Sequence, residues 1–121
     1  MVTLVIVAVL AAIALPTYQG SVRKARRADA MDAAIALQQA QERYRSNNTS
    51  YATTLATIGQ SATSPGSYYG LVLSAATAAG YTLTLSGVTG SSQASDSGCT
   101  TLTATVRNGS PTLTPAACWS R

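Results

Sequence analysis

Histidine is absent from this chain, and only four side chains are carboxylates: Asp29, Asp32, Glu42 and Asp96. General acid–base catalysis and zinc binding depend mainly on these residue types. No serine or cysteine has a histidine beside it to activate it as a nucleophile, and no glycine-rich phosphate loop follows a predicted strand. The sequence therefore indicates a protein that is not an enzyme and that holds no metal or other cofactor.

Charged side chains are also scarce, at 10% of the residues against roughly 25% in an average soluble protein. Serine, threonine, alanine and glycine take their place, as is typical of secreted or assembled proteins. Four of the eight basic residues form one basic cluster, which consists of Arg23, Lys24, Arg26 and Arg27. This basic cluster is either a solvated stretch or a contact for anionic phospholipid or for acidic groups of a neighbouring subunit. A nucleic-acid surface has no supporting recognition motif.

Only two cysteines are present, Cys99 and Cys118, and both lie late in the chain. Two cysteines without histidine are too few ligands for a structural zinc site. In an exported chain they are expected to form a disulfide. The bond would close a short C-terminal loop and stabilise the fold by roughly 3 kcal/mol.

Residues 1–15 form an apolar run with one polar side chain, Thr3, and no charge. Because the run stands at the N-terminus of the sequence with the basic cluster behind it, we expect it to be buried against lipid or other chains. As a helix it would measure about 22 Å, less than the roughly 30 Å of a bilayer core. Positive charge next to a membrane helix normally stays on the cytoplasmic side. The basic cluster after the run would therefore keep the C-terminal part in the cytoplasm, which disagrees with export. Both observations lead us to expect that the natural helix begins upstream of Met1.

The helical pattern continues beyond this run, although two residues are expected to interrupt it. Pro16 has no N–H to donate to the carbonyl of Ala12, and Gly20 adds freedom one turn later. We therefore expect a helix break at Pro16 and Gly20. The helical spacing then resumes on one face, which predicts one long helix over about residues 2–46. The apolar positions of that face are Ala30, Ala33, Leu37, Ala40 and Tyr44.

The second half of this helix carries two further expectations. Asp29 and Asp32 lie at helical spacings from the basic cluster and are expected to pair with it, although such pairs contribute little. Asn47 and Asn48, which are residues that tolerate left-handed geometry, are expected to end the helix. A short helical turn is predicted near residues 53–58 in the connection that follows.

After the turn at residues 64–67 the apolar residues alternate with polar ones, which predicts β-strands. The dipeptide Asn108-Gly109 marks a tight turn between the last two of them. The predicted strands lie near residues 69–73, 81–85, 101–106 and 112–114. We expect four antiparallel strands whose apolar face packs on the helix, with residues 87–98 as a loop that leads to Cys99.

The first thirty residues, MVTLVIVAVLAAIALPTYQGSVRKARRADA, closely resemble the N-terminal helix of type IV pilins. The matching elements are the apolar run, the segment 11–16, Tyr18 and the arginine-bearing helix behind them. This motif is specific to the pilin and pseudopilin superfamily.

The resemblance extends over nearly the whole chain. Residues 42–44, followed by residues 48–51 and Leu55, resemble the helix exit of the PilE-type pilins. Residues 90–93, which lead to Cys99, and the final Cys118-Trp119 resemble the disulfide-bounded C-terminal region of that group. The later match is less specific, but it favours pilins proper.

The fold that this resemblance implies is the α+β type IV pilin fold. A long N-terminal helix would pack on a small antiparallel sheet of about four strands, with a C-terminal loop bounded by a disulfide. Residues 1–27 would be the protruding half of the assembly helix, and residues 28–121 the globular head. Because family filaments often show a melted stretch before the proline, we also expect residues 8–16 to be partly non-helical.

The implied function is that of a structural subunit of a bacterial type IV pilus, an extracellular filament used in adhesion, twitching motility or DNA uptake. Its partners would be inner-membrane lipid before assembly, the pilus assembly machinery, and copies of itself in a helical filament. The apolar run would then exchange lipid for neighbouring helices, with small residues allowing close approach. The core of this assembly helix would be Val2, Leu4, Val5, Ile6, Ala8, Val9, Leu10, Ala12, Ile13 and Leu15.

The sequence departs from the family at its start. Family members begin with a phenylalanine, exposed by prepilin peptidase and then N-methylated, and have a glutamate a few residues later. Aligned on Pro16, that glutamate would fall two positions before Met1. The processing site, the methylated residue and the acidic assembly residue are therefore expected upstream of this sequence.

Three alternative functions remain. The chain could be a minor pilin that primes or tips the fibre. It could be a pseudopilin of a type II secretion system, although too few carboxylates are present for the calcium-binding loop usual there. It could also be a DNA- or surface-binding module that uses the basic cluster together with the aromatic residues Tyr68, Tyr69, Tyr81 and Trp119.

Overall fold

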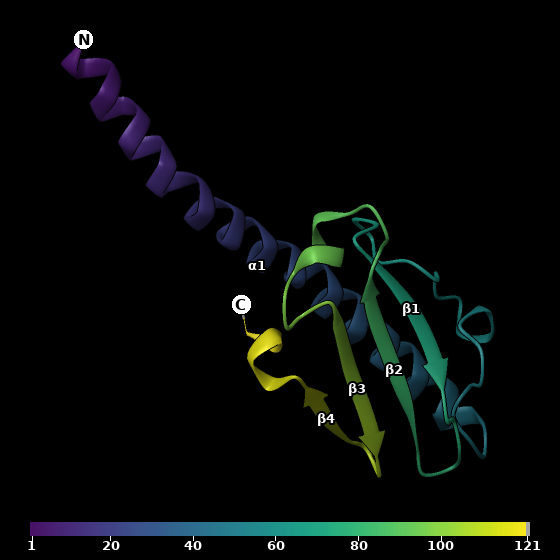
Figure 1. The fold of residues 1–121 in the computed structure, drawn as a ribbon. Helices are drawn as coiled ribbons and strands as arrows, with labels where there is room; N and C mark the ends of the chain where they lie inside the picture. Colours follow the sequence, from purple (N-terminus) through teal and green to yellow (C-terminus); the bar gives the residue numbers. More distant parts are fainter. Residues whose placement is uncertain (121) are drawn as a thin grey trace.

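The computed structural model describes residues 1–120 as one long helix attached to a small antiparallel sheet, as Figure 1 shows. The helix α1 spans Val2–Asn47, and its first half projects away from the sheet. The predicted helix over about residues 2–46 is confirmed, as is the arrangement of a long helix packed on a sheet. The projecting half and the packed half therefore face different surroundings within one continuous element.

The sheet contains four antiparallel strands in the order β1-β2-β3-β4, so each strand pairs with its neighbour in sequence. Their bounds are β1 Tyr69–Ser74, β2 Gly80–Gly87, β3 Thr101–Arg107 and β4 Ser110–Thr114. Three short 3₁₀ helices complete the head: η1 Ala56–Ile58, η2 Ser92–Ser95 and η3 Ala116–Trp119. All four predicted strands and the turn near residues 53–58 are confirmed. η2 lies within the predicted loop at residues 87–98.

The core lies between the second half of α1 and the inner face of the sheet. Alanines at the helix face, such as Ala30 and Ala33, let the sheet approach the helix closely, while Leu37 fills the space between them. Alternation along β2 and β3 places their apolar residues inward and their threonines outward. The fully buried large residues on the sheet side are Tyr69, Leu83, Leu85 and Leu102.

The expected helix break does not occur in this structure. α1 continues without interruption through Pro16 and Gly20, so residues 8–16 are helical. A proline removes one backbone hydrogen bond, and a glycine costs about 1 kcal/mol in a helix interior. The helical bonds on both sides of these two residues hold the element together.

The helix ends at Asn47 and Asn48 as predicted, although neither ends it with left-handed geometry. Asn48 follows the last helical residue with an extended backbone, at φ −135° and ψ 158°. Its side-chain amide donates to the carbonyl of Tyr44 at 2.8 Å, and the Arg45 guanidinium donates to the carbonyl of Asn48 at 2.7 Å. These side-chain hydrogen bonds satisfy carbonyls at the helix end without a left-handed residue.

Candidate assembly and DNA-binding surfaces

The first fifteen residues form an exposed apolar surface. Their large hydrophobic side chains are between 54% exposed, at Ile6, and fully exposed, at Met1. By length and composition, α1 could cross a membrane. The predicted assembly-helix residues Val2, Leu4, Val5, Ile6, Ala8, Val9, Leu10, Ala12, Ile13 and Leu15 are all exposed. Apolar surface of this extent requires cover from lipid or from other chains.

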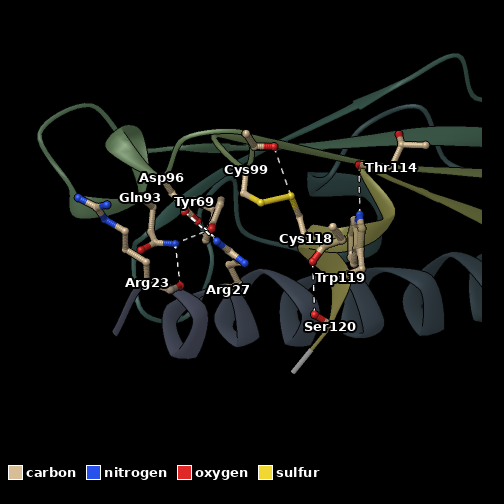
Figure 2. The surroundings of a disulfide bond; sticks show 12 residues. Arg23, Arg27, Tyr69, Gln93, Asp96, Cys99, Thr114, Cys118, Trp119 and Ser120 are labelled. Carbon is tan, nitrogen blue, oxygen red and sulfur yellow. Dashed lines mark hydrogen bonds and ion pairs between the residues drawn. A yellow bond between two sulfur atoms is a disulfide. The ribbon is translucent and has the colours of Figure 1, made fainter. Parts of the chain in front are cut away.

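The basic cluster has a structural role that its sequence did not indicate, because Arg27 binds the loop after β2. Its guanidinium donates from Nε and Nη2 to the two carboxylate oxygens of Asp96, at 2.7 and 2.8 Å. The side chains of Arg27 and Asp96 are only 17% and 6% exposed. This two-bond contact, drawn in Figure 2, raises the pKa of Arg27 above its ordinary value.

Two further contacts hold the same loop against α1. Arg26 donates to the Ser92 hydroxyl and lies over the ring of Tyr68, 4.7 Å from its centroid. The buried amide of Gln93 donates to the backbone carbonyl of Arg23 at 3.2 Å. Half of the basic cluster therefore attaches the head to the helix, while Lys24 remains exposed.

Gln93 also reaches the sheet, since its amide donates to the hydroxyl of Tyr69 at 2.7 Å, as Figure 2 shows. Burial raises the pKa of Tyr69. Both side chains are fully buried. The loop after β2 is thus joined to both layers of the head by hydrogen bonds.

The carboxylate of Asp29 binds the turn before β1 and not the basic cluster. Its carboxylate accepts hydrogen bonds from the Ser64 hydroxyl and from the backbone N–H of Gly66, the latter at 2.8 Å. The expected pairing of Asp29 with the basic cluster is therefore wrong. Arg26 and Arg27 are instead turned toward residues 92–96, which are distant in sequence.

The disulfide between Cys99 and Cys118 is present, as predicted. It joins the segment before β3 to η3, and both residues are buried. Trp119, the next residue, is half-buried and donates from its indole N–H to the carbonyl of Thr114 at 3.1 Å (Figure 2). These contacts hold the C-terminal segment beside α1.

At the end of the head opposite the apolar helix, the turn after β3 meets the turn between β1 and β2, which Arg45 also contacts. Arg45 donates to the carbonyl of Ala78 at 3.4 Å, in the turn between β1 and β2. The neighbouring Ala79 carbonyl accepts from the backbone N–H of Asn108 at 2.7 Å, directly after the exposed Arg107. The sequence does not reveal this arrangement, because Arg45 and Arg107 stand more than sixty positions apart. The one signal for it in the sequence was the expectation of four antiparallel strands, whose turns gather at the two ends of a sheet.

The outer face of the sheet is rich in hydroxyl groups, and we call it the hydroxyl face. Cross-strand pairing places Thr82 beside Thr105 and Thr105 beside Thr112, while Thr84, Thr103 and Thr114 form a second row. Arg107 continues the alternation of β3 at the end of this face. The four side-chain carboxylates of the chain lie elsewhere, on α1 and beside η2. Hydroxyl groups and one arginine, without carboxylates, suit a polyanion.

Two of the four aromatic residues considered for DNA binding belong to the core. Tyr69 and Tyr81 are buried, and Tyr81 packs edge-to-face on Tyr51 with ring centroids 5.0 Å apart. Burial also raises the pKa of Tyr81. Tyr68 is half-buried beneath Arg26. Tyr69 and Tyr81 therefore cannot stack with bases.

Tyr81→Phe is expected to leave the stability of the head unchanged or to raise it by up to about 1 kcal/mol. Among the described residues, the buried hydroxyl of Tyr81 has no hydrogen-bond partner, so its removal breaks no bond. Urea unfolding of the full chain in detergent measures the change. Tyr69→Phe is the matched control and is expected to be destabilising, because it removes one of the two hydrogen-bond partners of the buried Gln93 amide. Equal losses in both variants would contradict the prediction.

A protruding apolar helix that continues into the core of a disulfide-bonded, four-stranded head defines a type IV pilin. The chain belongs to the family described as type IV minor pilin ComP, DNA uptake sequence receptor, whose family model matches residues 16–103. This confirms the resemblance drawn from the N-terminal motif and the structural role of a filament subunit. Among curated proteins there is no significant match.

Proposed function

We propose that this chain is a minor subunit of a type IV pilus that binds double-stranded DNA during DNA uptake. The observation that carries the proposal is the family match over residues 16–103, since that family is described as a DNA uptake sequence receptor. Before assembly the apolar half of α1 anchors the chain in the inner membrane. After assembly the head lies on the extracellular filament, and its partners are other pilus subunits, the assembly machinery and DNA.

The DNA-binding surface that we favour is the hydroxyl face together with Arg107, because it combines hydroxyl donors and an exposed arginine with no carboxylate. Arginine and threonine side chains both donate to phosphate oxygens, which accept a large share of the hydrogen bonds in protein–DNA complexes. A face without carboxylates avoids repelling the phosphates. The two rows of threonines give several donors at regular positions along β2 and β3.

The basic cluster is the second candidate for this surface. Its Lys24 is exposed, and Arg26 remains half-exposed above Tyr68. Replacing all four cluster residues would also break the contact between Arg27 and Asp96, so a loss of binding would be ambiguous. Lys24→Ala removes one charge of the cluster without touching that contact and tests the cluster alone.

Arg107→Ala is expected to weaken binding of a labelled DNA duplex about fivefold or more, and to reduce the salt dependence of binding by about one phosphate contact. Thr105→Glu, which places a carboxylate in the middle of the hydroxyl face, should weaken binding further. Fluorescence anisotropy of the full chain in detergent, at several salt concentrations, gives both quantities.

Arg43→Ala is the matched control, because Arg43 is an exposed arginine on α1, which packs on the inner face of the sheet and not on the hydroxyl face. It should retain affinity within about twofold, since exposed charges away from the contact act only through screened, long-range fields. Loss of binding in Lys24→Ala alone would move the site to the basic cluster. Failure of the unmodified chain to bind any duplex would contradict the DNA-binding function, leaving a structural subunit.

A further inference from the structure

A small basic pocket lies on α1 at the point where the helix meets the loop after β2. It encloses about 220 Å³. The residues that line it are Tyr18, Gln19, Val22, Arg23, Arg26 and Ser92. Two of these side chains are guanidinium groups and none is a carboxylate. Because the only charges in its wall are positive and its polar groups can donate hydrogen bonds, the pocket suits an anion.

Both arginines of the pocket keep N–H groups for a ligand, since a guanidinium carries five of them. Arg26 uses Nη1 to bind the Ser92 hydroxyl, and its other nitrogens have no hydrogen-bond partner among the described residues. Arg23 accepts one hydrogen bond at its backbone carbonyl, and Figure 2 shows its side chain without a contact to the other residues drawn. The carboxylate of Asp96, on the same loop as Ser92, is already neutralised by Arg27. The positive charge of the pocket is therefore unbalanced.

The place of the pocket along α1 indicates which anion it meets. By length and composition α1 could cross a membrane, and its apolar run ends at Leu15. Tyr18 lies about 4.5 Å further along the axis, within a headgroup layer that is roughly 5–7 Å thick on each side. It is 67% exposed, as suits an aromatic side chain at a membrane interface. Arg23 lies about 12 Å beyond Leu15, and its long side chain leans back toward the helix N-terminus, which brings the guanidinium close to the lipid phosphates.

We propose that this pocket binds the phosphate of an anionic phospholipid while the chain is anchored in the membrane before assembly. Arg23 and Arg26 donate to the phosphate oxygens, which guanidinium groups bind with parallel hydrogen bonds. Because Arg26 also binds Ser92, the lipid meets the helix and the head together and holds the head in one orientation on the membrane surface. The inference rests on the proposed membrane anchorage and adds the class of lipid and the residues that bind it.

Inorganic phosphate and DNA carry the same phosphate chemistry, but the position of the pocket favours lipid. The apolar run lies directly before the pocket on α1, so a chain anchored through that run holds the pocket at the membrane surface. The surface proposed for DNA lies instead on the outer face of the sheet, at the hydroxyl face and Arg107. The test below separates the three anions.

Native mass spectrometry of the full chain, released from nanodiscs that contain phosphatidylcholine and phosphatidylglycerol, measures the fraction of chain that retains an anionic lipid. Arg23→Gln and Arg26→Gln should each lower this fraction about fivefold, as expected for one cation lost at a membrane surface. Lys24→Gln is the matched control, because Lys24 is an exposed neighbouring cation that does not line the pocket. It should keep the fraction within about twofold, since exposed charges are screened. Equal losses in all three variants, or no preference of the unmodified chain for phosphatidylglycerol, would overturn the proposal.

Arg23→Gln is the decisive variant, because it keeps the backbone carbonyl that Gln93 binds and removes only the side chain. Its urea unfolding should match that of the unmodified chain, which separates loss of lipid from loss of structure. Inorganic phosphate or a DNA duplex, added to the nanodiscs in amounts equal to the lipid, should leave the lipid-bound fraction unchanged. Displacement by either would assign the pocket to that anion and overturn the proposal. Arg107→Ala should retain lipid fully, so a failure of the DNA-binding function and a failure of the lipid site are distinguishable.

Discussion

Replacing both Cys99 and Cys118 by alanine is expected to lower the free energy of unfolding of the head by about 3 kcal/mol. The two residues are 19 positions apart, so the bond closes a short loop and restricts the unfolded chain. The folded C-terminal segment also depends on the bond, because β4 is an exposed edge strand. The η3 turn that follows is held by the hydrogen bond from Trp119 to Thr114. Alanine is preferred to serine, since a buried hydroxyl would add an unpaired polar group.

Urea unfolding of the full chain in detergent, with and without reductant, measures this effect. The unmodified chain should unfold at a lower urea concentration once its disulfide is reduced. The urea concentration at which the double variant unfolds should be the same with and without reductant. Thr114→Ala, a change at an exposed position of the same segment, is the control for general disturbance there. A double variant that unfolds at the urea concentration of the oxidised, unmodified chain would contradict the prediction.

Asp96→Ala is expected to lower the free energy of unfolding by about 2–4 kcal/mol, because it leaves the Arg27 guanidinium largely buried without its carboxylate. Two hydrogen bonds are lost together, and the loop that contains Gln93 loses one of its attachments to α1. An arginine guanidinium keeps its proton at any pH at which the protein is studied, even without the carboxylate of Asp96. The unpaired group cannot therefore escape the cost of burial by losing its proton.

A double-mutant cycle isolates this contact. Asp96→Ala, Arg27→Ala and the double variant should give a coupling free energy of at least about 1 kcal/mol, because the two side chains act as one unit. Arg43→Ala provides the control for removal of an exposed arginine from α1 and should change stability by less than about 0.5 kcal/mol. Strictly additive losses from the two single variants would show that the pair contributes nothing of its own.

The secondary structure of the head follows from local patterns and was predicted closely. Alternation of apolar and polar residues identified all four strands, because a half-buried strand must turn every second side chain inward. The helical spacing of Ala30, Ala33 and Leu37 identified the face that the sheet covers. The disulfide followed from the cysteine count, since an exported chain with two cysteines has one possible pairing.

The structure departs from the preferences of single residues where neighbouring hydrogen bonds oppose them. Pro16 and Gly20 disfavour helix by themselves, yet α1 continues through both because the flanking turns keep their hydrogen bonds. Asn48 tolerates a left-handed conformation, but the hydrogen bond from its own side chain to Tyr44 favours an extended backbone. The free energy that an unfavourable residue costs at one or two positions is smaller than the free energy that the surrounding hydrogen bonds contribute.

By itself, the sequence determined the class of the protein and the order of its elements, because apolar periodicity and the N-terminal motif are local properties. Only the tertiary structure decided what the charged residues do. It separated the basic cluster into arginines that bind residues 92–96 and a lysine that stays exposed, and it brought the turns beside Arg45 and Arg107 together. Such partners are distant in the chain and are brought together by the packing of the helix on the sheet. The spacing of residues along the sequence does not reveal that packing.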